Sequence, residues 1–343
     1  MLYYYALLYY NINLKQIKTM KKIHIISTLI GLLIFSTLAK AELKVVTSIK
    51  PIHSLASYIM DGVGSPGLIV DGYNSPHSFQ LKPSHAKMLE QADIIFWIGE
   101  DLENFLEKPL DTIAKKAEKI ELLEIKNIKK LKFRERNIFE EHEGHDDHGH
   151  DAKKEEHDDH GHDAKKEEHD DHEEHGHGEY DPHIWLDPIN AKIILNEITE
   201  HLIENDSKNT STYNSNLTKA LAKIDKLIID VITETNKNLS YVVFHDAYQY
   251  YENRFNVNIL GAMTVNPDVM PGAEQIHEIH EVIEHDNVSC ILSEPQFNPD
   301  IIKSIAKDTS VKTGVLDPLG ANLKPGKNLY FDLIRNMSSS FNC

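Results

Sequence analysis

The chain has 343 residues and a formal net charge of −18, from 36 basic and 54 acidic side chains. Its hydrophobic fraction of 41% is sufficient for packed cores, which excludes a chain that is disordered throughout. The acidic balance excludes a nucleic-acid partner, because phosphate binding requires clustered Lys and Arg. The charge is concentrated: residues 140–179 hold 18 acids and 4 lysines, a net of −14, which leaves −4 for the rest of the chain.

The N-terminus carries the pattern of a secretory signal peptide. Two lysines precede an apolar run at residues 25–35, and Ala39-Lys40-Ala41 offers the small residues of a cleavage site. The alternative is a membrane anchor, but the run is shorter than the roughly 20 residues that a span needs. We therefore expect export with cleavage after Ala41, and a true start at either Met1 or Met20.

The rest of the chain alternates short apolar strands with helices, in two groups. The first group has predicted strands at Leu43–Ser48, Gly67–Val70 and Ile94–Ile98, with helices at Ile52–Met60 and Lys82–Gln91. The second has predicted strands at Tyr241–Phe244, Val257–Gly261, Val288–Leu292 and Lys312–Leu316, with helices near Ala273–Glu284 and Asp300–Ala306. Such βα repetition predicts an α/β protein with two Rossmann-like domains built on parallel sheets.

A long helix is predicted between the two groups, because an apolar residue recurs every three or four positions from Tyr213 to Val231. It would run from about Thr210 to Lys237, about 40 Å at 1.5 Å per residue, and would join the two halves rigidly. The predicted organisation is an N-terminal extension with signal peptide, an N-terminal domain, a connecting helix and a C-terminal domain, at residues 1–41, 42–206, 207–238 and 239–343.

Within the N-terminal domain, residues 140–179 form a low-complexity segment with 11 of the 21 histidines. Residues 145–156 recur unchanged at 157–168, and no residue there is apolar except Ala. We therefore predict a disordered surface loop. Imidazole suits zinc, copper and nickel, so the loop is a candidate for weak metal capture, with a solvated acidic spacer as the alternative. Its histidines are His142, His145, His148, His150, His157, His160, His162, His169, His172, His175 and His177.

The chain has two cysteines, Cys290 and Cys343, which are 53 positions apart. An exported protein meets an oxidising compartment, so a single disulfide between them is expected, with two free thiols as the alternative.

Three histidines outside the acidic segment stand beside turn residues or at a strand end: His77, His183 and His245. In open α/β sheets, ligands gather beyond the carboxyl ends of the strands. Three neutral imidazoles are a good zinc set that leaves a fourth position for a carboxylate or water. The spacing itself leaves two interpretations open, one shared site or ordinary loop histidines.

Several motifs, taken together, resemble those of a known family. They are Thr47-Ser48-Ile49-Lys50-Pro51-Ile52, Ser75-Pro76-His77 with Leu81-Lys82-Pro83-Ser84, Asp93 through Gly99, Asp181-Pro182-His183-Ile184-Trp185-Leu186-Asp187-Pro188, Phe244-His245-Asp246-Ala247-Tyr248, Ser293-Glu294-Pro295-Gln296-Phe297 and Leu316-Asp317-Pro318-Leu319-Gly320. Over about Leu43 to Cys343 the chain resembles the zinc-specific branch of the metal-binding cluster of solute-binding proteins, the ZnuA type of ABC importer component. A His-rich acidic insert before the Asp-Pro-His stretch is typical of that branch, as is a paired cysteine at the C-terminus.

The resemblance implies that His77, His183 and His245 bind one Zn²⁺ in the cleft between the domains, with Asp317 or water as the fourth ligand. It implies transport without catalysis, so that Zn²⁺ is the transported ligand. The protein would be a periplasmic monomer that captures Zn²⁺ and delivers it to the permease of an ABC transporter, which works with its ATPase. The His-rich loop would then serve as an auxiliary, low-affinity site of zinc capture.

Two other classes of function fit parts of the sequence. A zinc hydrolase would use the three histidines, a bound water and Glu294 as general base, although the sequence has no His-Glu-x-x-His motif. A metal buffer or surface adhesin would act through the loop alone. The other histidines considered have no expected ligand role: His53, His85, His277, His280 and His285.

Overall fold

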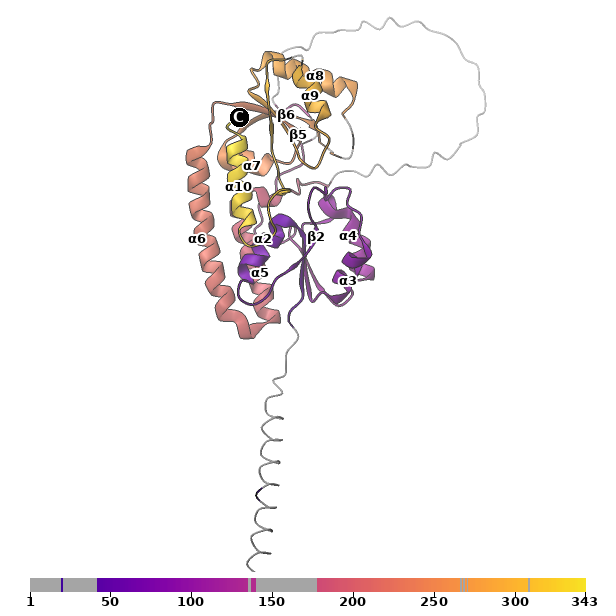
Figure 1. The fold of residues 1–343 in the computed structure, drawn as a ribbon, viewed down its shortest axis with the longest axis vertical. Coiled ribbons are helices and arrows are strands. Elements are labelled where there is room, and N and C mark those ends of the chain that lie inside the picture. The colour runs from indigo at the N-terminus through magenta and orange to yellow at the C-terminus, as the bar shows by residue number, and fades with distance from the viewer. Residues whose placement is uncertain are drawn as a thin grey trace, which may run out of the picture. The chain divides into compact units, whose positions relative to one another are not determined.

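The computed structural model describes residues 20, 42–134, 137–139, 178–265, 267, 269, 271–307 and 309–343. Leu43–Cys343 forms one compact unit. The predicted signal peptide and the predicted loop, apart from its last two residues, lie outside the described residues. The fold of Leu43–Cys343 is drawn in Figure 1.

The first sheet contains four parallel strands in the order β2-β1-β3-β4. Their bounds are β1 Val45–Ile49, β2 Gly67–Val70, β3 Ile94–Trp97 and β4 Glu118–Glu121. Every residue of β1 and β3 is buried, because helices cover a parallel sheet on both faces and favour continuous apolar runs. The strand order reverses between β1 and β3, and a crevice for ligands is expected beyond the carboxyl ends of these strands. We call this sheet with its helices the N-terminal lobe.

The second sheet repeats the arrangement, with four parallel strands in the order β6-β5-β7-β8. Their bounds are β5 Ser240–His245, β6 Asn258–Thr264, β7 Cys290–Ser293 and β8 Lys312–Val315. The central strand β5 is completely buried and pairs with β6 on one side and β7 on the other. This sheet with its helices is the C-terminal lobe. Two parallel-sheet α/β halves confirm the predicted fold class.

The helices of the two lobes have the following bounds: α2 Lys50–Ile59, α3 Pro83–Gln91, α4 Glu100–Thr112, α5 Pro188–Asn205, α6 Thr210–Glu234, α7 Gln249–Phe255, α8 Ala273–His285, α9 Asp300–Lys307 and α10 Leu329–Ser340, with 3-10 turns at Ile184–Leu186 and Ser207–Asn209. The long helix α6 ends three residues before the predicted Lys237. Thr235 follows it in an extended conformation and cannot continue the helix.

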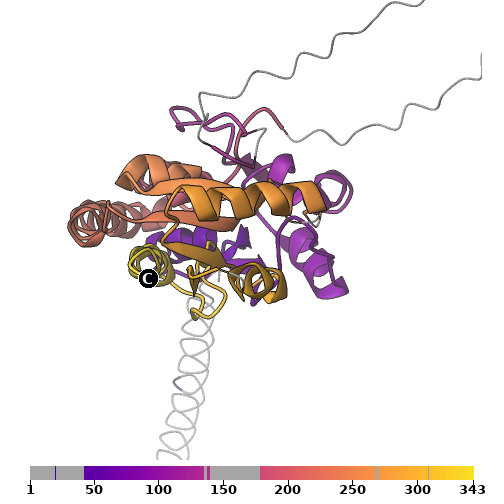
Figure 2. The ribbon, with the colours of Figure 1, turned by 90° about the horizontal axis from the view of Figure 1, so that it is seen from above.

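The long helix α6 lies against other helices along its length. It packs against α2, α5 and α10, and α10 also packs against α2. Figures 1 and 2 show the yellow α10 beside α6 in two perpendicular views. The helix α10 follows the last strand of the C-terminal lobe but packs on α2 of the N-terminal lobe. The lobes are therefore connected through a shared layer of helices as well as through the chain itself.

The start of α5 is fixed by its first residues. The carboxylate of Asp187 accepts a hydrogen bond from the backbone N–H of Ile189 at 2.8 Å, and Pro188 occupies the first turn. Arg254 holds the same carboxylate with two hydrogen bonds of 2.7 Å from Nε and Nη2. Because Asp187 also ends the Ile184–Leu186 turn, these contacts fix the position of the residue before that turn, His183.

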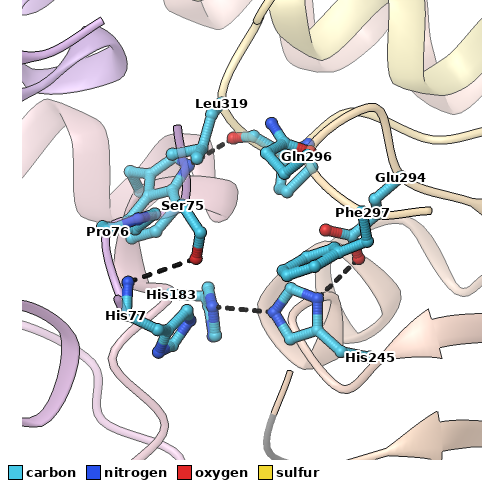
Figure 3. Close-up of a pocket in the computed structure, with 11 residues that line it drawn as sticks. Ser75, Pro76, His77, His183, His245, Glu294, Gln296, Phe297 and Leu319 are labelled. Carbon is cyan, nitrogen blue, oxygen red and sulfur yellow. Dashed lines mark hydrogen bonds and ion pairs between the residues drawn. The ribbon is translucent and has the colours of Figure 1, made fainter. Parts of the chain in front are cut away.

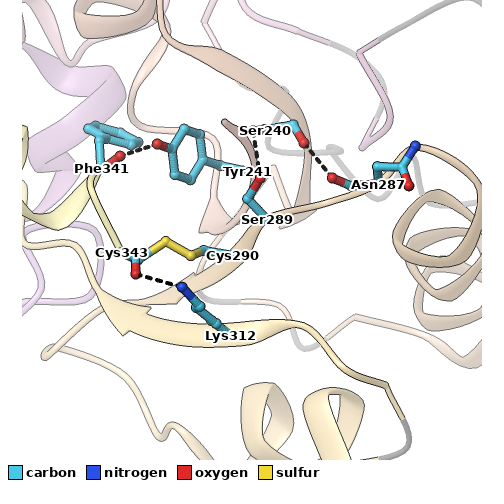
Figure 4. The surroundings of a disulfide bond; sticks show 8 residues. All are labelled: Ser240, Tyr241, Asn287, Ser289, Cys290, Lys312, Phe341 and Cys343. Carbon is cyan, nitrogen blue, oxygen red and sulfur yellow. Dashed lines mark hydrogen bonds between the residues drawn. A yellow bond between two sulfur atoms is a disulfide. The ribbon is translucent and has the colours of Figure 1, made fainter. Parts of the chain in front are cut away.

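Cys290 and Cys343 form a disulfide, as predicted (Figure 4). Cys290 is the first residue of β7, and Cys343 ends the chain three residues after α10. Near it, the Tyr241 hydroxyl donates to the backbone oxygen of Phe341, and Lys312 Nζ donates to that of Cys343 at 3.3 Å. The bond therefore links the segment after α10 to the C-terminal sheet.

The segments on either side of residues 140–177 are attached to both lobes. Lys132 pairs with Tyr180 in an antiparallel bridge within the N-terminal lobe. Ile138 pairs in the same way with Gly261 on the outer strand β6 of the C-terminal lobe. A Cβ atom on Gly261 would lie only 2.6 Å from the backbone oxygen of Asn137, so this approach requires glycine.

Candidate metal centre

Three of the sequence-predicted residues converge in the structure: His77, His183 and His245 (Figure 3). One ring nitrogen of each lies within 4.8 Å of the other two. The Nε2 atoms of His183 and His245 are 3.3 Å apart, and the His77 ring lies 5.6 and 5.7 Å from the His183 and His245 rings. An ion among these nitrogens would be bound by three imidazoles, a set that is typical of zinc.

The three histidines come from different parts of the chain. His77 lies in the segment after β2, His183 precedes the Ile184–Leu186 turn, and His245 is the last residue of β5. The position of His245 follows from the topology, because parallel strands place their carboxyl ends at one edge of the sheet. The cluster thus combines two histidines from segments that precede α5 with one from the C-terminal sheet.

Two buried carboxylates orient the imidazoles. Asp181 Oδ1 lies 2.7 Å from Nδ1 of His183 and also accepts the backbone N–H of that residue at 2.9 Å. Glu294 Oε1 lies 2.6 Å from Nδ1 of His245. When a carboxylate accepts the proton on Nδ1, the Nε2 atom of the same ring is left as an electron-pair donor for a metal. Metal-binding histidines commonly have such an outer carboxylate, which fixes the tautomer and the ring orientation.

The charge states of these groups follow from their burial and their neighbours. Burial, assisted by His245, lowers the pKa of His183 well below its ordinary value, so this imidazole is neutral. Burial also works against the charged form of His245, but carboxylates, chiefly Glu294, outweigh it and raise its pKa. Burial raises the pKa of Asp181 to about 7. Acidic groups therefore lie beside imidazoles that bind metal when neutral, and burial disfavours the charged form of one of them, Asp181.

The cavity beside the three histidines is small. Its volume is about 10 Å³, near the lower limit for one water molecule. Apolar side chains form much of its wall, among them Trp185, Phe297 and Leu319. Trp185 is held in place by a 2.9 Å hydrogen bond from Nε1 to the backbone oxygen of Pro318. The pocket thus has room for about one ion or water-sized ligand beside the three rings.

Asp317, the predicted alternative to water as fourth ligand, has a different set of contacts. Its Oδ1 accepts hydrogen bonds from the backbone N–H groups of Leu319 and Gly320 and from Gln296, at 2.9–3.1 Å. Its Oδ2 accepts the N–H of Ala321 at 2.6 Å. The residue does not line the pocket. In this structure its carboxylate stabilises the turn after β8.

The carboxylate considered as a general base, Glu294, instead contacts an imidazole directly, as described above. The other histidines lie outside the cluster. His53 Nε2 is 3.2 Å from the backbone oxygen of Pro66, His85 accepts the backbone N–H of Lys82, and His277 pairs with Glu281. Each of these three imidazoles thus has a contact of its own outside the cluster. The histidines of the predicted loop lie outside the described residues.

Sequence reasoning did not identify Asp181 and Arg134 as contributors to the site. Asp181 belongs to one of the sequence motifs, but its contact with His183 could not be predicted without the fold. Arg134 Nη1 lies 3.4 Å from Asp246, the residue after His245, and its Nη2 pairs with Glu252. Burial raises the pKa of Asp246 to about 7, and Arg134 opposes that shift. No local pattern around Arg134 indicates this partnership across 112 positions.

Two α/β lobes with a three-histidine pocket at the carboxyl end of a sheet define a metal-binding solute-binding protein. Comparison with known proteins agrees. The family model "Zinc-uptake complex component A periplasmic" (ZnuA) matches residues 45–342, and the chain belongs to this family. The family is a solute-binding component of zinc transport with Zn²⁺ as its transported ligand, and it is not an enzyme.

Similar proteins cover nearly all of the chain. The high-affinity zinc uptake system protein ZnuA of Brucella abortus (strain 2308) is 46% identical over 312 residues, 89% of this chain and 92% of that protein. A crystal structure of ZnuA has a TM-score of 0.67 at 20% identity and covers 87% of this chain and 99% of its own. A zinc-bound ZnuA lacking residues 138–173 of its own numbering has a TM-score of 0.66 at 20% identity, with 86% and 95% covered. Both structures share the fold.

The family is periplasmic. In the described parts of the chain, no helix has both the length and the apolar character needed to cross a membrane.

Proposed function

We propose that this protein binds Zn²⁺ through His77, His183 and His245 and delivers it for uptake. The observation that carries the proposal is the convergence of these three ring nitrogens, within 4.8 Å of one another, at a cavity of about 10 Å³. Zinc is bound by nitrogen ligands at about 2.0–2.1 Å in tetrahedral sites, so an ion among the three rings would need only small side-chain adjustments. A small pocket lined largely by apolar side chains suits a transported ion that is held between capture and release.

Water is the fourth ligand in this proposal. The four hydrogen bonds to Asp317 would have to break before its carboxylate could turn to the ion. The N–H groups freed in that movement would lose their acceptor, at a cost of about 1–3 kcal/mol for each one left buried. Three neutral imidazoles and a water leave the ion with its full charge, which the carboxylates of Asp181 and Glu294 compensate from the outer side.

Delivery would be made to the membrane permease of an ABC transporter, powered by its ATPase, because the family is the periplasmic component of such a system. All three proposed ligands belong to one chain, which supports a monomeric binding protein. The cleaved signal peptide expected at residues 1–41 would place the chain in the periplasm, in agreement with the family.

We predict that the site prefers Zn²⁺ over Mn²⁺ and that His245→Asp narrows the preference. Imidazole suits zinc, whereas manganese is favoured by carboxylates and binds more weakly along the divalent series. The new carboxylate would face Glu294, so the variant is best made together with Glu294→Gln, with Glu294→Gln alone as its matched control. The dissociation constant for Mn²⁺ divided by that for Zn²⁺ should fall by roughly tenfold or more from the control to the double variant. Competition titrations measure it; Mn²⁺ displacing Zn²⁺ from the unaltered protein would contradict the assignment.

The His-rich segment would serve as an auxiliary, low-affinity site of zinc capture. Its 11 histidines stand among 18 acids, which attract cations and supply ligands. Removal of residues 140–177 would leave the flanks attached, since Phe139 and Glu179 form their backbone contacts outside that range. The rival interpretation, an acidic spacer, predicts no metal beyond the cleft ion.

Deleting residues 140–177 should therefore reduce the number of weakly bound Zn²⁺ ions and leave one tight ion. Acid titration of the intact mature protein should show two steps. The ordinary pKa of imidazole is near 6.5, and the surrounding carboxylates favour the protonated form, so the loop histidines should lose their ions first, while the preorganised cleft ligands release their ion at lower pH. The deletion variant should show only the second step. Metal analysis during the titration makes the measurement, and equal stoichiometry in the two proteins would support the spacer instead.

A further inference from the structure

A second group of potential metal ligands lies on the N-terminal lobe, at a distance from the three-histidine pocket. It consists of Glu118, His201 and Glu204, and one ligand atom of each lies within 4.8 Å of the other two. Glu118 is the first residue of the edge strand β4, where it pairs with the first residue of β3. It therefore lies at the amino end of the sheet, whereas the transport site lies at carboxyl ends.

The contacts of His201 point to a ligand position. Its Nδ1 is completely buried and 2.8 Å from Glu118 Oε1, yet it makes no hydrogen bond of acceptable geometry. Its Nε2 is 3.3 Å from Glu197 Oε1, one turn earlier on α5. The ring lies edge-on to Phe96, with 6.2 Å between the two ring centroids. The buried ring nitrogen thus faces a carboxylate oxygen that it does not bond in line, and the two atoms could both bind an ion once they move slightly apart, because ligands around a tetrahedral ion are farther apart than 2.8 Å.

The charge around this imidazole also favours a cation. The carboxylates of Glu118, Glu197 and Glu204 all face His201 or its neighbouring turn, and in the described part of the chain none of them forms an ion pair with Lys or Arg. Asn205 Nδ2 donates to the other oxygen of Glu118 at 2.9 Å. That hydrogen bond orients the carboxylate toward the helix, in the way that an outer partner orients a metal ligand.

From this arrangement we propose that Glu118, His201 and Glu204 form a second Zn²⁺ site, which links the end of α5 to the edge strand β4. One imidazole with two carboxylates favours zinc over magnesium and calcium, which take oxygen ligands. The site is shallow, since the Glu118 side chain is 38% exposed and the His201 side chain 19%. It therefore binds more weakly than the enclosed cleft and exchanges with the surroundings.

The test measures His201 itself, because total metal content would be dominated by the His-rich segment. The mature full-length protein is treated with diethyl pyrocarbonate at a series of free Zn²⁺ concentrations set by a metal buffer, and modification of each histidine is read from its peptide by mass spectrometry. We expect Zn²⁺ to protect His201 at concentrations that leave His277 on α8 reactive. His277 is the matched control, because it is exposed and has a single carboxylate partner, Glu281. Mg²⁺ at the same concentrations should protect neither.

Two variants test whether Zn²⁺ protects His201 by coordinating it together with the two carboxylates. Glu118→Gln and Glu204→Gln each remove one ligand, keep the shape of the side chain and leave His201 in place. Each should raise the protecting Zn²⁺ concentration by about tenfold or more. Protection that is unchanged in both variants, or His201 that stays as reactive as His277 throughout, would overturn the proposal. The protection should persist in His183→Ala, so that failure of the transport site and failure of this one are distinguished.

Discussion

Replacing His77, His183 or His245 by alanine is expected to weaken Zn²⁺ binding in the cleft by more than about 100-fold, since loss of an outer-shell partner alone costs 10–100-fold. Two imidazoles cannot complete the coordination, and the cavity is too small for several waters to take the place of a ring. The change at His183 or His245 also leaves a buried carboxylate, Asp181 or Glu294, without its imidazole partner. The effect should thus exceed the loss of one metal bond.

The measurement is competition against a chelator of known affinity, with residues 140–177 deleted so that the cleft ion is observed by itself. His277→Ala is the matched control, because this histidine lies on the exposed side of α8 and should leave the affinity unchanged. Asp317→Ala should have a smaller effect than any of the three, since water fills the fourth position. If all three histidine variants retained the original affinity, the site would have to lie elsewhere.

Removing the disulfide by Cys290→Ser with Cys343→Ser is expected to lower the free energy of unfolding by about 4 kcal/mol. The bond closes a loop of 53 positions, and the chain-entropy model gives a cost of that size for releasing it in the unfolded state. The segment after α10 would also lose its covalent link to the sheet at β7. Because α10 packs on the N-terminal lobe, the loss should extend beyond the C-terminal strands.

Denaturant unfolding of the metal-free proteins, with and without the bond, makes the comparison. Both cysteines are replaced together so that no buried thiol remains at Cys290, and the reduced parent protein serves as the control that should match the variant. An unfolding midpoint equal to that of the oxidised parent would show that the noncovalent contacts of the C-terminus, such as the one between Tyr241 and Phe341, are sufficient.

The buried strands could be predicted from the sequence because they are apolar throughout. β1 and β3 are surrounded by helices and neighbouring strands, so no polar alternation interrupts them. The edge strand β4 was missed for the opposite reason, since Ile120 is its single buried residue and charged residues make up the rest. The helices α5 and α10 were also missed. Their apolar residues face several partners in the shared helical layer, so that no simple one-faced pattern marks them.

For the site, the sequence predicted the three histidines but could not supply their surroundings. His245 ends a predicted strand, and the topological rule for parallel sheets places such residues at a common edge. The pairing of His245 with Glu294 spans 49 positions and depends on the register of two strands. The local sequence around Asp317 suits a ligand as well as a turn, and the four hydrogen bonds that occupy its carboxylate depend on the loop conformation after β8.

The helical layer shared by the lobes has a mechanical consequence. The backbone of α6 spans about 37 Å over its 25 residues, and each turn of it is stiffened by internal hydrogen bonds. A connection made of a continuous helix with α10 packed against it resists bending far more than a pair of extended linkers would. Wide opening of the two halves about a soft hinge is therefore disfavoured. Escape of the ion would instead follow small displacements of the residues that line the pocket, among them the buried Trp185, which is attached to the turn at Pro318.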